Sequence, residues 1–165
     1  MKKLIAVFFF LINFSLYAQV RSREPLTMHK FVHIGYVYQN SGFGEVGGRI
    51  LLLRHDDVAF RVGAAALMGS SNSEFAIMPK AQADVLFNFR RNVDFYHSWY
   101  FLAGAEATDK YIAPKAGFNI AGMLDITGGY GFAYKNQTLK GKKLEGLNIG
   151  VTLNMPIPLL VDLFK

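Results

Sequence analysis

The sequence predicts an all-β fold, an eight-stranded antiparallel up-and-down transmembrane β-barrel. Apolar and polar residues alternate with a period of two along most of the chain, which indicates strands. The alternation is clearest from Lys115 to Tyr134, where large apolar or aromatic residues face a set of glycines and polar residues. A polar face that also holds glycines suits a crowded interior, so the apolar face is expected to meet lipid. The chain is 52% hydrophobic, yet after the N-terminus it has no apolar run long enough for a spanning helix.

The N-terminus has the pattern of a secretory signal peptide. Met1 to Lys3 is a short basic start, residues 4–16 are almost wholly apolar, and Ala18 follows as a candidate cleavage position. We expect residues 1–18 to be removed and residues 19–165 to form one outer-membrane barrel domain. The alternative is an N-terminal anchor, which is disfavoured because the apolar run is shorter than the ~20 residues that span a bilayer.

Composition excludes several classes of site. The chain has no cysteine, so disulfides, thiolate metal sites and cysteine nucleophiles are excluded. Without Lys2 and Lys3 there are 16 Lys and Arg against 12 Asp and Glu, a net charge of +4. These charges form no basic stripe with interleaved stacking aromatics, so we expect no nucleic-acid partner.

Eight strands follow from the alternation, most of them near the ~9–11 residues of a tilted membrane strand. An even number places both chain ends on the same side. Residues 19–30 are interpreted as a polar lead-in, and Pro79 predicts a kink or bulge because it has no N–H to donate. The predicted strands are 31–38, 44–53, 58–68, 75–89, 97–107, 115–121, 126–134 and 146–155. The predicted connections are 40–42, 54–57, 69–74, 90–96, 108–114, 122–125 and 135–143, and the last of these is the most hydrophilic.

The inward faces of these strands carry charges of both signs. An eight-stranded barrel is filled by side chains, and unpaired buried charges are costly, so we expect a structural salt-bridge network and no open pore. A narrow ion path or proton relay is the alternative. The predicted lumen network is Glu45, Arg49, Arg61, Lys80, Asp84 and Lys115, with Glu106 a further candidate because the phase of strand 97–107 is left open.

The outward faces carry aromatic residues near the strand ends. Aromatic girdles are typical of the two interfaces of a membrane barrel; a buried aromatic core in a soluble barrel is the alternative. The predicted girdle residues are Tyr36, Tyr38, Phe75, Phe87, Phe89, Tyr130, Phe132 and Tyr134.

Candidate catalytic and metal-binding residues are few. His29 and His33 would lie about 13 Å apart on a strand, too far to share one metal ion. His97 and Ser98 would point to opposite faces of a strand, which disfavours a nucleophile–base pair. We therefore expect no enzyme activity and no catalytic, metal or cofactor-binding residues.

Two runs resemble a known group of proteins. Residues 114–119 (PKAGFN) and 125–132 (DITGGYGF) are similar to segments of the small outer-membrane β-barrel proteins common in Bacteroidetes. The resemblance implies an OmpA/OmpX-like eight-stranded barrel and brings no catalytic residues with it. The chain departs from this pattern in its short loops and in its tail, residues 156–165, where Phe164 is penultimate and no aromatic residue is terminal.

These observations predict a non-enzymatic protein of the bacterial outer membrane with a structural or surface-interaction role. Its expected partners are outer-membrane lipid and, during insertion, the barrel-assembly machinery, and a monomer is expected. Two alternatives stay open. One is an outer-membrane lipid-modifying enzyme of the lipid A deacylase kind, and the other is a soluble periplasmic β-barrel that binds a small apolar ligand.

Overall fold

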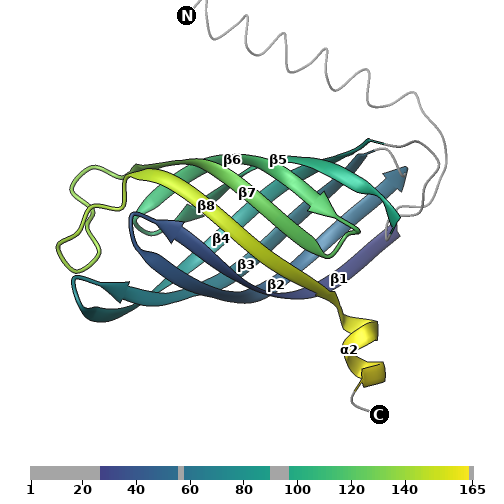
Figure 1. The fold of residues 1–165 in the computed structure, drawn as a ribbon, viewed down its shortest axis with the longest axis horizontal. Helices are drawn as coiled ribbons and strands as arrows, with labels where there is room; N and C mark the ends of the chain where they lie inside the picture. The colour runs from purple at the N-terminus through teal and green to yellow at the C-terminus, as the bar shows by residue number, and fades with distance from the viewer. Residues whose placement is uncertain (1–26, 56–57, 90–96, 164–165) are drawn as a thin grey trace, which may run out of the picture.

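Eight antiparallel strands pair in chain order, and β1 also pairs with β8, which closes the barrel (Figure 1). The computed structural model describes residues 27–55, 58–89 and 97–163. The all-β, eight-stranded antiparallel prediction is confirmed. The strands are β1 (Thr27–Gln39), β2 (Gly42–His55), β3 (Val58–Ser71), β4 (Glu74–Asn88), β5 (Trp99–Thr108), β6 (Tyr111–Ile120), β7 (Leu124–Ala133) and β8 (Gly146–Pro156), followed by a short helix, α2 (Ile157–Leu163). Three predicted features lie outside the described residues: the signal peptide, the turn at 90–96, and residues 56–57 of the turn at 54–57.

Side chains alternate between an exposed and a buried face on each strand, as the sequence predicts. In β8, Ile149 and Val151 are 43% and 44% exposed, whereas Asn148 and Asn154 are 1% exposed. The phase of β5, which the sequence left open, places Trp99 and Phe101 outward and Tyr100 and Leu102 inward. The barrel therefore holds its polar and charged strand residues inside, together with some apolar ones, and has a largely apolar outer wall.

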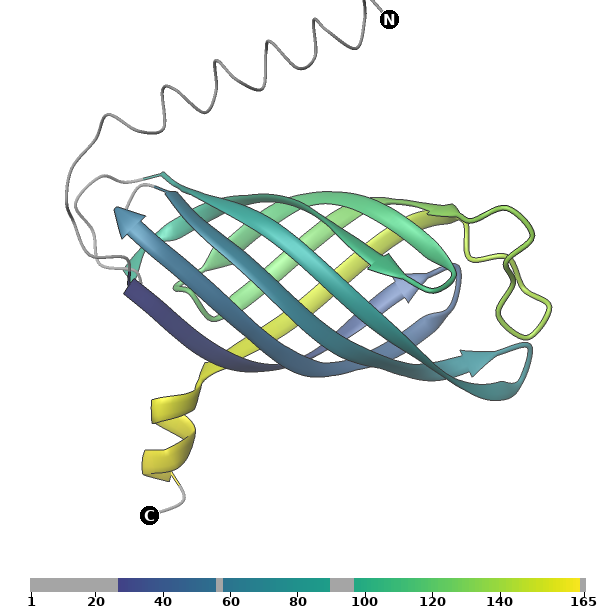
Figure 2. The ribbon, with the colours of Figure 1, turned by 180° about the vertical axis from the view of Figure 1, so that it is seen from behind.

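The two ends of the barrel differ (Figures 1 and 2). At one end, here called the loop end, lie residues 40–41, 72–73, 109–110 and 134–145, which connect the strands in pairs. At the opposite, terminal end lie the start of β1, the end of β8 and α2. Three of the four connections at the loop end are two residues long. Asn40 (φ 52°) and Asn72 (φ 48°) occupy the left-handed backbone region that such turns need and that asparagine tolerates.

Several predicted boundaries are wrong, and at three connections the predicted loop is too long. Residues 108–114 are not a loop, because β6 begins at Tyr111. The Thr108 side-chain oxygen accepts hydrogen bonds from the N–H groups of Lys110 and Tyr111, both at 3.0 Å, which closes a two-residue turn. Residues 69–74 contain only the turn at 72–73, and residues 27–30 of the predicted lead-in belong to β1.

Pro79 causes no bulge, contrary to the prediction. The register runs unbroken from Ala66 opposite Pro79 to Leu67 opposite Met78. Pro79 lies one residue beyond the β4–β5 pairing, which ends at Lys80 opposite Thr108. A missing N–H is tolerated at such an unpaired strand edge.

The predicted break at 122–125 is also shorter than expected. The Met123 N–H donates to the Ile120 carbonyl at 3.0 Å, so the turn is residues 121–123, and Leu124 and Asp125 belong to β7. At the C-terminus the tail forms α2, which the sequence did not predict. Among the described residues no helix is long and apolar enough to cross a membrane.

Close backbone approach explains one glycine inside the barrel. A Cβ at Gly117 would collide with the Ile126 carbonyl oxygen and lie 2.8 Å from the Thr127 Cα. Gly128, on the outward face of β7, has nothing within 4 Å of the same position. The two glycines therefore form a matched pair, one crowded and one open.

We predict that Gly117→Ala lowers the free energy of unfolding by about 1–3 kcal/mol, because the backbone of β7 must shift. Gly128→Ala should change it by no more than about 0.5 kcal/mol. Urea unfolding in lipid vesicles, followed by the fluorescence of the single tryptophan, measures both. Equal effects of the two substitutions would contradict this packing.

Candidate functional site: a ring of charges in the lumen

Among the residues that the structure describes, eight charged side chains lie buried in the middle of the lumen, four cationic and four anionic. None of them is more than 8% exposed, and they come from six of the eight strands. They are Glu45, Arg49, Arg61, Lys80, Asp84, Glu106, Lys115 and Asp125.

The lysines form one half of a continuous chain of ion pairs. Lys80 Nζ lies 2.6 Å from Glu45 Oε2 and 3.2 Å from Glu106 Oε2. Lys115 Nζ lies 3.3 Å from the same Glu106 oxygen and 3.9 Å from Asp84 Oδ1. Each lysine therefore bridges two carboxylates, and Glu106 bridges the two lysines.

The arginines form the other half and close the chain into a ring. Arg61 Nη2 lies 3.0 Å from Asp84 Oδ2 and 2.9 Å from Asp125 Oδ2. Arg49 Nη1 lies 2.5 Å from Asp125 Oδ2, and its Nη2 lies 3.5 Å from Glu45 Oε1. Every cation thus contacts two anions and every anion two cations. We call these eight residues the charge ring.

Neutral side chains donate further hydrogen bonds to two of the carboxylates, Glu106 and Asp125. Glu106 Oε1 accepts hydrogen bonds from the Tyr111 hydroxyl at 2.9 Å and from Asn148 Nδ2 at 3.0 Å. Asp125 Oδ1 accepts one from Asn119 Nδ2 at 2.6 Å. These bonds stabilise the ionised carboxylates, since buried charges need such partners.

The two remaining strands, β1 and β8, also join the network. His33 Nε2 on β1 lies 2.8 Å from Glu45 Oε1. Asn154 on β8 donates to Asp125 Oδ2 at 3.1 Å and accepts from Arg49 Nη1 at 2.7 Å. All eight strands are therefore tied to one another through the lumen as well as through the sheet.

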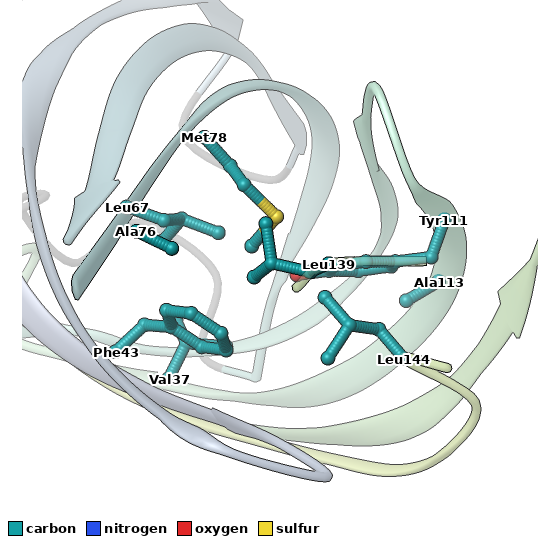
Figure 3. Close-up of a cluster of buried hydrophobic side chains, with 9 residues drawn as sticks. All are labelled: Val37, Phe43, Leu67, Ala76, Met78, Tyr111, Ala113, Leu139 and Leu144. Carbon is teal, nitrogen blue, oxygen red and sulfur yellow. The ribbon is translucent and has the colours of Figure 1, made fainter. Parts of the chain in front are cut away.

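An apolar cluster lies on each side of the charge ring. The terminal-end cluster comes from the terminal-end portions of β1 to β5 and consists of Phe31, Leu51, Ala59, Leu86 and Tyr100. The loop-end cluster consists of Val37, Phe43, Leu67, Ala76, Met78, Tyr111, Ala113, Leu139 and Leu144. Figure 3 shows the wall residues of the loop-end cluster pointing inward toward Leu139 and Leu144.

Leu139 and Leu144 come from residues 134–145, which we call the cap loop because they cover the loop end of the lumen. Leu139 and Lys142 exchange two backbone hydrogen bonds of 2.8 and 3.0 Å, forming a tight turn. Side chains of the neighbouring turns bind the loop backbone: Ser71 Oγ donates to the Leu139 carbonyl at 3.0 Å, and Asn72 Nδ2 donates to the Lys140 carbonyl at 2.7 Å. Asn40 Nδ2 donates to the Lys143 carbonyl at 2.9 Å.

The structure brings together all six residues of the predicted lumen network, Glu45, Arg49, Arg61, Lys80, Asp84 and Lys115. Glu106 is a seventh member of the ring, and Asp125 is the member that the sequence analysis missed, because Asp125 was assigned to a break between strands. Asp125 lies two residues before the inward Thr127, and this spacing on a strand predicts that Asp125 also points inward. The cap loop was interpreted only as a hydrophilic loop, although Leu139 and Leu144 interrupt its polar run.

The residues considered for catalysis or metal binding do not come together into one site. His97 is exposed and Ser98 is buried, with Ser98 Oγ 3.3 Å from Asn88 Nδ2. His33 belongs to the lumen network, and His29 is at the terminal end. In the described ranges no three His, Cys, Asp or Glu side chains are grouped so that they could hold a metal ion.

No known family model and no curated protein matches the chain. Two solved structures are similar to it. The N-terminal β-barrel domain of Pseudomonas aeruginosa OprF is 13% identical, with 79% of this chain and 100% of that chain covered and a TM-score of 0.42. The de novo designed TMB2.3 is 20% identical, with 82% and 98% covered and a TM-score of 0.35. At this level of likeness neither structure assigns a role to any residue of this chain.

We predict that Asp125→Asn lowers the free energy of unfolding by about 3–5 kcal/mol, because two buried arginines lose a shared anion. Lys140→Gln is the control. It removes an exposed ion pair with Glu74 (3.1 Å) and should cost no more than about 1 kcal/mol. Denaturant unfolding in vesicles measures both, and a loss of less than 1 kcal/mol for Asp125→Asn would show that the charge ring does not stabilise the barrel.

Proposed function

We propose that this chain is an outer-membrane β-barrel with a structural or surface-interaction role, a closed lumen and no catalytic turnover. One observation carries the proposal: the polarity of the barrel is inverted, with the charge ring inside and large apolar side chains outside. A water-soluble barrel would be expected to show the reverse arrangement.

The outer wall supports a lipid environment. Large apolar side chains cover it on every strand, and monomeric soluble proteins rarely expose contiguous apolar patches above a few hundred Å². A closed barrel also pairs its backbone groups between neighbouring strands, which the hydrocarbon of a bilayer requires. The exposed residues include Ile34, Val46, Ile50, Phe60, Val62, Phe87, Phe101, Phe118, Ile126, Ile149, Val151 and Leu153.

Aromatic residues at both ends of the wall fit the two membrane interfaces. Tyr38, Phe132 and Tyr134 lie near the loop end, and they are 41%, 52% and 38% exposed. Phe87 and Phe89 lie near the terminal end and are 45% and 60% exposed. This arrangement is the one expected of the two girdles.

The filled lumen supports a role without conduction. The charge ring occupies its middle, and an apolar cluster lies on each side of the ring. The cap loop is the only one of the four connections at the loop end that exceeds two residues. A surface interaction made by this end would therefore centre on the cap loop.

We further propose export by a cleavable signal peptide of residues 1–18, insertion by the barrel-assembly machinery, and a monomeric state in contact with outer-membrane lipid. Residues 114–119 and 125–132 support membership of the OmpA/OmpX-like barrels of Bacteroidetes, whose segments they resemble.

The experiment is fractionation of a Gram-negative expression host, followed by electrophoresis of heated and unheated samples. We expect the chain in the outer-membrane fraction, floating with lipid, and migrating at a different apparent mass before and after boiling, because a closed barrel resists detergent. Recovery in the soluble periplasm with no shift on heating would contradict the proposal.

The same purified protein tests the closed lumen. In planar bilayers the wild-type chain should give no discrete current steps under conditions in which a known porin gives them. Regular ion-selective steps from the wild-type chain would favour an ion path over a filled lumen.

A further inference from the structure

A cleft at the terminal end is not used by the lumen network. β1 pairs with β8 only from Phe31, opposite Pro156, because the chain then turns into α2. The preceding residues of β1 pair with β2 alone, from Thr27 opposite Leu53 to Lys30 opposite Ile50. The space between them and α2 is a cleft of about 250 Å³, lined by Met28, His29, Lys30, Pro156, Ile157 and Pro158.

The lining of this cleft combines basic and apolar side chains. Lys30 and His29 are the polar members, and no acidic side chain lines the cleft. Lys30 is exposed on the outward face of β1, and within the described ranges it has no ion pair. Met28 is 53% exposed and Ile157 is 39% exposed, so apolar surface is open on both sides of the lysine.

The position of the cleft selects its occupant. It lies at the terminal end and includes Lys30 on the outward face of β1, and the outward Ile50, paired with Lys30, leads from it into the apolar wall. A ligand that fits has a phosphate for Lys30 and hydrocarbon chains for the wall. We propose that this cleft binds one anionic glycerophospholipid of the leaflet at the terminal end, its phosphate at Lys30 and its acyl chains running along the wall past Ile50.

This inference rests on the proposed membrane location, and it gives α2 a function: together with Pro156, the helix forms the second wall of the lipid site. Lysine suits the task because its long apolar stem packs on the barrel while its ammonium group reaches the headgroup region. Leu159 of α2, which is 45% exposed, extends the apolar surface beyond the cleft.

The test is native mass spectrometry of the full processed protein released from nanodiscs that contain phosphatidylglycerol and phosphatidylcholine in equal amounts. We expect the wild-type chain to retain one phosphatidylglycerol in preference to phosphatidylcholine. Lys30→Gln should lower that retention about tenfold, the scale of one charge-assisted hydrogen bond, and Lys30→Arg should preserve it.

Lys135→Gln is the matched control, since Lys135 is an exposed lysine at the loop end. It should leave retention unchanged. Equal retention of the two lipids by the wild-type chain, or unchanged retention by Lys30→Gln, would overturn the inference. Displacement of the lipid by soluble glycerol phosphate would also overturn it, because the site would then recognise phosphate alone.

Each variant must show the heat-dependent migration of a folded barrel. A wild-type chain that lacks this shift and does not float with lipid contradicts the proposed function, whereas a folded chain without lipid preference contradicts only the lipid site.

Discussion

Neutralisation of charge inside the barrel is the constraint on which the rest of the structure depends. A single buried ion costs several kcal/mol, and this lumen holds eight. The cost is offset because the charge ring alternates in sign, so that each carboxylate lies between two cations. Removal of any member leaves its two neighbours with one partner fewer, and the ring therefore acts as a unit.

The charge ring also fixes how the strands align. A slip of one residue turns every side chain of a strand to the opposite face, which would place a ring member such as Arg61 or Asp125 in the outer wall. The apolar clusters on both sides of the ring exclude water from it, and the Leu139 and Leu144 side chains of the cap loop complete one of them. Lumen, wall and cap loop are therefore parts of one arrangement, in which the charges are paired inside between two apolar clusters and large apolar side chains cover the outside.

Sequence periodicity predicted the barrel, the facing of seven of its eight strands and six of the eight ring residues, because the alternation can be followed along consecutive residues of each strand. Asp125 was missed because it was assigned to a break between two strands, and only the barrel places it beside Arg49 and Arg61. The strand start at Tyr111 was missed because the Thr108 side chain, not glycine or proline, closes the turn. The bulge predicted at Pro79 was wrong because the sequence does not show the pairing register. The register places Pro79 beyond the β4–β5 ladder, where its missing N–H breaks no bond of that ladder.

We propose that the apolar outer wall faces lipid while the charges face the lumen. Trp99 tests it directly, because it is the one tryptophan of the chain, lies on the outward face of β5 and is 57% exposed. In vesicles, lipids brominated near the top of their acyl chains should quench its fluorescence strongly, and aqueous iodide should quench it little. Quenching by iodide with no response to brominated lipid would place this wall in water and contradict the account.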